Sequence, residues 1–206
     1  MSRAEGSFQN ALMEASAFFM KEGKVHTTLR RLTDRLNEAR IPYVVLGGMA
    51  LNAHGYERVT VDVDILTTRD GLDRIHEMLV GRGYLPKFPG SRKTLRDTTT
   101  DVSIDFITAG EYPGDARPKA VQFPDPEAVA VDYSGYKVID LPHLFELKLA
   151  SGLSNALRLK DLADAQQMIL IIKPPRELGE QLDATVRDEY YRMWDAAQNA
   201  KPVWNE

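Results

Sequence analysis

Leu46-Gly47-Gly48, followed thirteen residues later by Val61-Asp62-Val63-Asp64-Ile65, is the stretch of sequence that decides the fold. Successive side chains in a β-strand point to opposite faces, so Asp62 and Asp64 point the same way, with Cα atoms about 6.5 Å apart. The alternating Val61, Val63 and Ile65 would face a core. Two carboxylates on one face could share a metal ion, while a half-exposed edge strand with an acidic face is the alternative explanation.

The two glycines form a turn between an apolar run and residues 49–54, which are compatible with a short helix. Backbone N–H groups at the start of a helix, together with the positive end of its dipole, suit a phosphate. An ordinary tight turn explains Gly47 and Gly48 equally well. The glycines therefore gain meaning only in combination with the acidic strand.

The composition limits the chemistry that the chain can perform. With 206 residues it is long enough for one well-packed domain and a small helical appendage. The absence of cysteine excludes disulfides, thiol nucleophiles and cysteine zinc sites, and the four histidines show no close ligand spacing. A hard, oxygen-ligated ion such as Mg²⁺ is therefore favoured over zinc.

Hydropathy and charge indicate where the protein works. The apolar runs are far shorter than the roughly 20 residues of a membrane helix, and residues 1–5 lack the apolar core of a secretion signal. We therefore expect a cytoplasmic protein that makes no membrane contact. The net charge of −4 argues against broad binding of nucleic acid. Two basic groups could still meet a phosphate backbone or form solvated faces: Arg30-Arg31 with Arg35, and Arg92-Lys93 with Arg96.

Hydrophobic periodicity and capping residues predict the order of the elements. Helices are expected over residues 7–20, 27–39, 49–54, 72–80, 142–150, 157–170 and 183–197, with Thr67 or Thr68 and Asp140 as N-caps. Strands are expected at 43–46, around Asp62 and Asp64, at 94–96 and 102–107, and as a hairpin over 129–138 turned at Ser134-Gly135. The order is typical of an α+β (mixed α/β) domain, with a small mixed sheet flanked by helices and a C-terminal helical region.

These motifs resemble the DNA polymerase beta-like nucleotidyltransferases, whose signature is an apolar residue, Gly-Gly or Gly-Ser, a spacer of about this length, and Asp-x-Asp between apolar residues. Asp105, flanked by apolar residues on a later strand, matches that family's third acid. Two further strings look like the AbiEii-type branch: Gly47-Gly48-Met49-Ala50-Leu51, and Arg58-Val59-Thr60-Val61-Asp62-Val63-Asp64. Downstream, Lys148 precedes Arg158-Leu159-Lys160-Asp161-Leu162-Ala163-Asp164, as in that branch. The resemblance covers residues 43–170.

The resemblance implies a nucleotidyltransferase fold and assigns roles to individual residues. Asp62 and Asp64 would hold two Mg²⁺ ions about 4 Å apart, with Mn²⁺ as a substitute. Asp105 would complete the site of the catalytic ion and accept a proton from the acceptor hydroxyl. The nucleotide-binding candidates are Gly47, Gly48, Arg58, Lys148, Lys160 and Asp161.

Structural alternatives stay open for several of these residues. Arg58 could bind phosphate or brace the acidic strand. Lys148 could contact the triphosphate or lie on a solvated helix face. Lys160 and Asp164 are i, i+4 neighbours that could form a pair within one helix, and Asp161 could face the nucleotide.

The implied activity is Mg²⁺-dependent transfer of a nucleoside monophosphate from a nucleoside triphosphate such as ATP to an acceptor hydroxyl, with release of pyrophosphate. The acceptor could be tRNA or another RNA, a protein or a small molecule, and the AbiEii-type branch implies a toxin of a toxin-antitoxin system with an antitoxin protein as partner. The alternative is a catalytically silent protein of the same fold that binds a nucleotide or a partner and regulates.

We expect three parts in the chain: an N-terminal helical extension (1–26), a nucleotidyltransferase catalytic domain (27–139) and a C-terminal helical region packed on it (140–206). The N-terminal helix, which carries Phe8, Phe18 and Phe19, is expected to pack on the core, with a dimer contact as the alternative.

Overall fold

The computed structural model of the chain describes residues 10–11, 13–18 and 23–199. Its centre is a seven-stranded mixed sheet in the order β3-β4-β5-β2-β1-β7-β6. The strands are β1 (Tyr43–Val45), β2 (Asp62–Thr67), β3 (Tyr84–Pro86), β4 (Thr94–Asp97), β5 (Ser103–Thr108), β6 (Ala130–Tyr133) and β7 (Tyr136–Ile139). The expected mixed α/β architecture is therefore confirmed.

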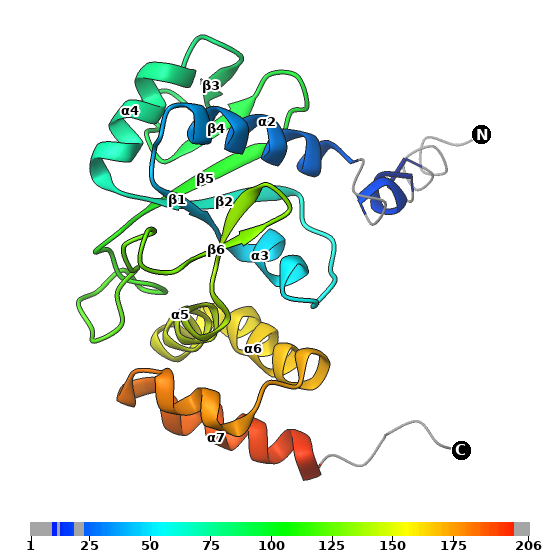
Figure 1. Cartoon of the computed structure of the whole chain (residues 1–206), viewed down its shortest axis with the longest axis vertical. Helices are drawn as coiled ribbons and strands as arrows, with labels where there is room; N and C mark the ends of the chain where they lie inside the picture. Colours follow the sequence, from blue (N-terminus) through cyan, green and yellow to red (C-terminus); the bar gives the residue numbers. More distant parts are fainter. Residues whose placement is uncertain (1–9, 12, 19–22, 200–206) are drawn as a thin grey trace.

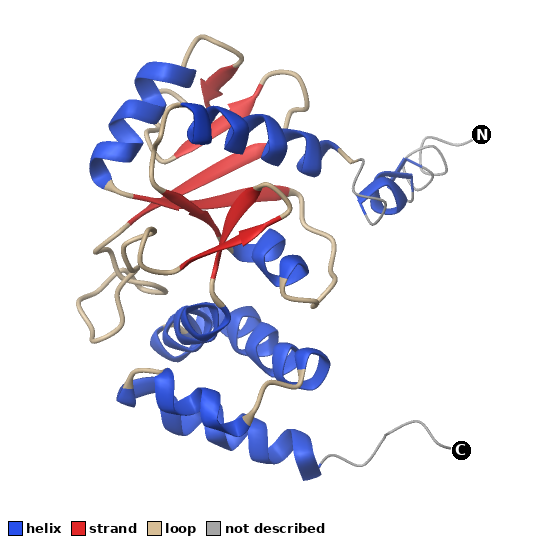
Figure 2. Ribbon diagram, in the orientation of Figure 1, coloured by secondary structure: helices blue, strands red, loops and turns tan. Residues whose placement is uncertain are grey.

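Helices pack against the sheet, and the last three helices lie together beyond one end of it. They are α2 (Lys24–Glu38), α3 (Gly47–Ala53), α4 (Arg69–Leu79), α5 (Leu141–Ser154), α6 (Leu159–Ile172) and α7 (Ala184–Asn199), with 3-10 turns η1 (Ala156–Arg158) and η2 (Arg176–Gln181). Figure 1 shows α2 lying across the sheet, and Figure 2 shows α5, α6 and α7 grouped below it. No helix among the described residues has the length and apolar character needed to cross a bilayer.

The three central strands set the geometry on which the candidate site depends. Strand β2 runs antiparallel to β1 and parallel to β5, with Asp64 opposite Asp105. Ile104 and Phe106, the neighbours of Asp105, are buried on the other face of β5, as is Val63 of β2. Because side chains alternate along both strands, the apolar face anchors the sheet and the acidic face stays accessible.

Local signals in the sequence placed several element boundaries correctly. The Thr68 hydroxyl accepts a 2.9 Å hydrogen bond from the Gly71 N–H at the start of α4. The Asp140 carboxylate accepts one of 2.9 Å from the His143 N–H at the start of α5. The β6–β7 hairpin turns at Ser134 and Gly135, both with positive φ.

Helix ends shift by up to four residues from those expected, and α3 begins at Gly47 itself. Three further features differ from the sequence prediction. Val61 does not anchor a core: it is 77% exposed, because β2 begins one residue later, at Asp62. Strand β3 was not anticipated, since it has three residues and ends at a proline. The turn η2 follows Pro174-Pro175, where the sequence indicated only a break.

Part of the expected N-terminal helix lies outside the described residues. Residues 10–11 and 13–18 are helical. Phe18 is 5% exposed, and its ring centroid lies 4.7 Å from that of His26 in α2. Phe18 thus packs on the core as expected, whereas Phe8 and Phe19 lie outside the described residues.

A buried carboxylate, Asp97, joins α2 to the edge of the sheet. It accepts hydrogen bonds from the Arg31 guanidinium at 3.2 Å and from the Thr99 backbone N–H at 2.8 Å. The Thr28 hydroxyl lies 3.4 Å from one carboxylate oxygen of Asp97 and 2.5 Å from the Thr100 hydroxyl. A charge that is fully buried yet paired in this way should be costly to disturb.

We predict that Asp97→Asn lowers the free energy of unfolding by about 1–3 kcal/mol, because it removes the charge that faces Arg31. The measurement is urea unfolding followed by circular dichroism. Asp132→Asn, on the exposed face of β6, is the matched control and should change stability by less than about 0.5 kcal/mol. Equal effects of the two substitutions would contradict the assignment.

Candidate active site

The three predicted acids border one cavity of about 470 Å³. Asp62 and Asp64 reach it from β2 and Asp105 from β5, and the two glycines of the turn form another part of its wall. The remaining lining residues are mostly basic or apolar: Arg58, Val59, Thr60, Val61, Lys148, Leu157, Arg158, Lys160 and Asp161. All nine residues proposed as the site from the sequence therefore border the same cavity.

The glycine turn lies directly against the acidic strand. Gly47 has a φ of +58°, and a Cβ there would overlap the carboxylate of Asp64. A Cβ on Gly48 would come within 2.7 Å of the Thr60 Cβ. The Leu46 N–H also donates a 2.9 Å hydrogen bond to the Asp64 carbonyl. Both glycines are thus required by close packing, whatever the turn binds.

The surroundings of Asp64 disfavour the ionised form of its carboxyl group. Burial, the largest cause, and the negative charges of Asp62 and Asp105 together raise its pKa from the ordinary 3.8 to about 6. Lys148 and Arg58 oppose it without cancelling it. The surroundings of Asp64 therefore do not fully compensate its ionised form.

The donor set fits a hard divalent cation in chemistry and charge, because three carboxylates offer the oxygen ligands that Mg²⁺ prefers. As the side chains lie, no group of three or more His, Asp or Glu residues in the described part of the chain converges closely enough to hold an ion. Two of the acids accept hydrogen bonds from hydroxyl groups: Thr60 donates to Asp62 and Thr94 donates to Asp105, each at 2.7 Å.

Lys148 of α5 borders the cavity, and two buried acids hold its side chain. Its Nζ donates to Asp161 Oδ1 at 2.7 Å and to Asp164 Oδ2 at 2.8 Å. An ammonium has three donors, so two bonds to carboxylates leave one. The solvated-face alternative is wrong, since the side chain is only 13% exposed.

Asp161 borders the cavity, but both of its oxygens accept hydrogen bonds from the protein. Oδ1 accepts from Lys148, and Oδ2 accepts from the Ser151 hydroxyl at 2.6 Å and from Arg158 Nε at 3.0 Å. Burial alone would raise the pKa of Asp161, but Lys148, Ser151 and Arg158 outweigh burial and hold that pKa below its ordinary value. Asp161 is thus ionised and holds the positively charged side chains of Lys148 and Arg158.

Arg58 braces a helix rather than the acidic strand. Its Nη1 lies 3.4 Å from Asp164 Oδ1 in α6. Its backbone N–H donates to the Asn52 side chain, whose amide group in turn donates to the Arg58 carbonyl, both at 2.9 Å. The loop that carries Arg58 is therefore fixed at the rim of the cavity.

Lys160 is exposed and does not form the pair with Asp164 that the i, i+4 spacing allows. None of the ion pairs among the described residues joins the two. The reason is their orientation: Asp164 is 3% exposed and faces α5, while Lys160 points to solvent at the rim of the cavity.

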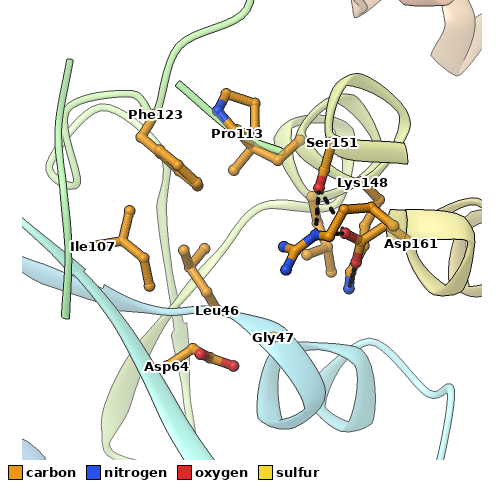
Figure 3. Close-up of a pocket in the computed structure, with 12 residues that line it drawn as sticks. Leu46, Gly47, Asp64, Ile107, Pro113, Phe123, Lys148, Ser151 and Asp161 are labelled. Carbon is orange, nitrogen blue, oxygen red and sulfur yellow. Dashed lines mark hydrogen bonds and ion pairs between the residues drawn. The ribbon is translucent and has the colours of Figure 1, made fainter. Parts of the chain in front are cut away.

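A smaller slot of about 140 Å³ adjoins the cluster at Asp64. Figure 3 shows Leu46, Ile107 and Phe123 along its apolar side, and Lys148, Ser151 and Asp161 at its polar end. Sequence reasoning missed Ser151 and Phe123. Ser151 lies in an apolar helix, and Phe123 lies in a loop rich in proline and glycine, so neither stood out as a binding residue.

The two basic groups named from the sequence are engaged within the protein. In the second, Arg92 pairs with Asp73, Lys93 with Glu111 and Arg96 with Asp101. In the first, Arg31 pairs with Asp97, and Arg35 lies over the Tyr84 ring and donates to the Arg82 carbonyl. These contacts give both groups a structural role.

Comparison with known proteins identifies the fold. No protein-family model and no curated protein matches the chain. The solution structure of the antibiotic-resistance factor ANT(2'')-Ia is similar over 84% of this chain and 97% of its own, at 16% identity and a TM-score of 0.51. A candidate nucleotidyltransferase from Thermotoga maritima is similar over 66% and 89%, at 19% identity and a TM-score of 0.46. The likeness to ANT(2'')-Ia shows that the chain has the fold of the nucleotidyltransferases, and it does not distinguish an AbiEii-type branch.

We predict that Gly47→Ala displaces the Asp64 carboxylate, because the new Cβ would occupy its place. Gly55→Ala is the matched control, since Gly55 also has positive φ but its Cβ would meet nothing. Each change should lower the free energy of unfolding by about 1–2 kcal/mol through backbone strain. Only Gly47→Ala should abolish a Mg²⁺-dependent rise in melting temperature. A Gly47→Ala variant that retains the wild-type response to Mg²⁺ would refute this.

We predict that Asp64→Asn stabilises the metal-free protein at pH 7. Because the pKa of Asp64 is raised from 3.8 to about 6, ionising this group costs stability. The cost is absent below about pH 4, grows between pH 4 and 6 and is complete above pH 6. The variant should therefore match the wild type at pH 4 and exceed it by about 1–3 kcal/mol at pH 7 in EDTA.

Urea unfolding at each pH measures this difference. Saturating Mg²⁺ should reverse the order at pH 7, since an ion held by the Asp64 carboxylate would stabilise the folded wild type and not the variant. A pH-independent difference, or equal stabilisation of both proteins by Mg²⁺, would show that Asp64 is not the crowded carboxylate described above.

Proposed function

We propose that the protein is a Mg²⁺-dependent nucleotidyltransferase that transfers a nucleoside monophosphate from a nucleoside triphosphate to an acceptor hydroxyl. The observation that carries the proposal is the pairing of Asp64 with Asp105 on neighbouring parallel strands, with Asp62 two residues earlier, in a cavity whose rim is basic. Three carboxylates opposite Arg58, Lys148 and Lys160 suit a metal ion bound together with a polyphosphate.

In the proposed reaction a bond forms between the acceptor oxygen and the α-phosphorus, and the bond from that phosphorus to the pyrophosphate oxygen breaks. When bound, Mg²⁺ at the three aspartates would polarise the α-phosphate. Asp105 would accept the proton of the acceptor hydroxyl. Arg58 and Lys148 would offset the negative charge that grows on the departing pyrophosphate.

We extend the proposal to the acceptor molecule and to a biological role. The AbiEii-type strings support tRNA or another RNA end as the first acceptor to test, and a toxin role with an antitoxin protein as partner. The internal pairing of the basic groups at residues 30–35 and 92–96 lends RNA no added support, so protein and small-molecule acceptors belong in the same experiment.

The test incubates the protein with Mg²⁺, each of the four α-labelled triphosphates in turn, and a cell extract that is afterwards separated into RNA, protein and small-molecule fractions. We expect label in one fraction, lost by at least about 100-fold in Asp62→Asn and Asp105→Asn. Asp132→Asn, which removes an exposed charge that does not line the cavity, should transfer label as the wild type does.

Equal labelling by the wild type and both site variants would overturn the proposal. Triphosphate binding without transfer to any fraction would instead support the silent, regulatory alternative.

A further inference from the structure

Asp164 lies behind the cavity rather than in its wall. It is 3% exposed and belongs to neither set of lining residues. Its two oxygens contact different cations: Oδ1 lies 3.4 Å from Arg58 Nη1, and Oδ2 accepts a 2.8 Å hydrogen bond from Lys148 Nζ. One buried carboxylate thus joins two basic side chains that do border the cavity.

Lys148 and Arg58 depend on Asp164 to different degrees. Lys148 has a second partner, since it also donates to Asp161 at 2.7 Å. Among the ion pairs of the described residues, Arg58 takes part only in the one with Asp164. Its Nε is buried without a hydrogen-bond partner in the described structure. Asn52 fixes the backbone of Arg58 but not the direction of its guanidinium.

Without Asp164, Arg58 would have other anions within the same cavity. Asp62 and Asp64 border that cavity together with Arg58. A guanidinium pairs readily with a carboxylate through its fork of N–H donors. An Arg58 side chain turned onto these acids would occupy the carboxylates and withdraw its own charge from a phosphate.

We propose that Asp164 is a positioning residue that holds Arg58 toward the triphosphate and away from the catalytic carboxylates. The inference rests on the proposed function and adds to it how the site keeps its cations and its carboxylates apart. Asp164 acts through Arg58, so its removal matters for phosphate binding only while Arg58 is present.

A double-mutant cycle on ligand affinity tests this dependence. The probe is inorganic tripolyphosphate with Mg²⁺, which carries the phosphate chain but no base, and the measurement is isothermal titration calorimetry. We expect Arg58→Ala and Asp164→Asn each to weaken binding by about 10-fold or more. The double variant should bind within about twofold of Arg58→Ala alone.

Two further variants make the cycle decisive. Asp195→Asn removes an exposed partner of Arg176 on α7, at 3.1 Å, and should leave the affinity unchanged. Asp164→Glu keeps the charge but moves it by one methylene, so it should restore part of the affinity lost in Asp164→Asn. If Asp164→Asn does not fold, Asp164→Glu replaces it in the cycle, with the same non-additivity expected.

A merely structural Asp164 would lower the melting temperature and weaken binding by the same factor with and without Arg58. Such additivity, or wild-type affinity in Asp164→Asn, overturns the inference while label transfer still upholds the enzyme. Tripolyphosphate that fails to bind the wild type, or that binds Arg58→Ala equally well, also overturns it. Only the absence of label transfer bears on the proposed function itself.

Discussion

The parallel pairing of β2 with β5 is the constraint on which the rest of the site depends. It sets Asp64 opposite Asp105 and leaves Asp64 half-buried beside like charges, with its pKa raised to about 6. The glycine at 47 leaves room for that carboxylate, and the hydroxyls of Thr60 and Thr94 each hold one of the neighbouring acids. The ionised form of Asp64 is therefore costly in the protein alone, and a cation bound there, as we propose, would offset that cost.

A second layer of charge extends the site into the C-terminal helices. Asp161 and Asp164 of α6 hold Lys148 of α5, and Asp164 also reaches Arg58 in the loop before β2. The pair between Arg58 and Asp164 crosses the boundary at residue 140 that we expect between the catalytic domain and the helical region. The division into parts stays a prediction. Arg58 and Lys148, the basic side chains at the cavity, come from opposite sides of that boundary and share Asp164 as a partner.

The sequence allowed prediction of the features that are local. Alternation along one strand placed Asp62 and Asp64 on a common face, and Thr68 and Asp140 cap their helices because an N-cap is read from a few adjacent residues. The partners of Asp164 could not be predicted in this way. Helical spacing offered it Lys160, four residues away, whereas the fold gave it Arg58 and Lys148 from other elements. Val61 was misplaced for a related reason, since strand periodicity does not show at which residue a strand begins.

The central claim is that Asp62, Asp64 and Asp105 form a cation site for a nucleoside triphosphate. The most direct measurement is anomalous diffraction from crystals grown with Mn²⁺ and a triphosphate whose α–β bridge resists cleavage. We predict Mn²⁺ peaks between Asp62 and Asp64, with Asp105 turned toward one of them and the phosphates facing Arg58 and Lys148. Occupied triphosphate with no Mn²⁺ at these carboxylates, or Mn²⁺ bound elsewhere, would contradict the account.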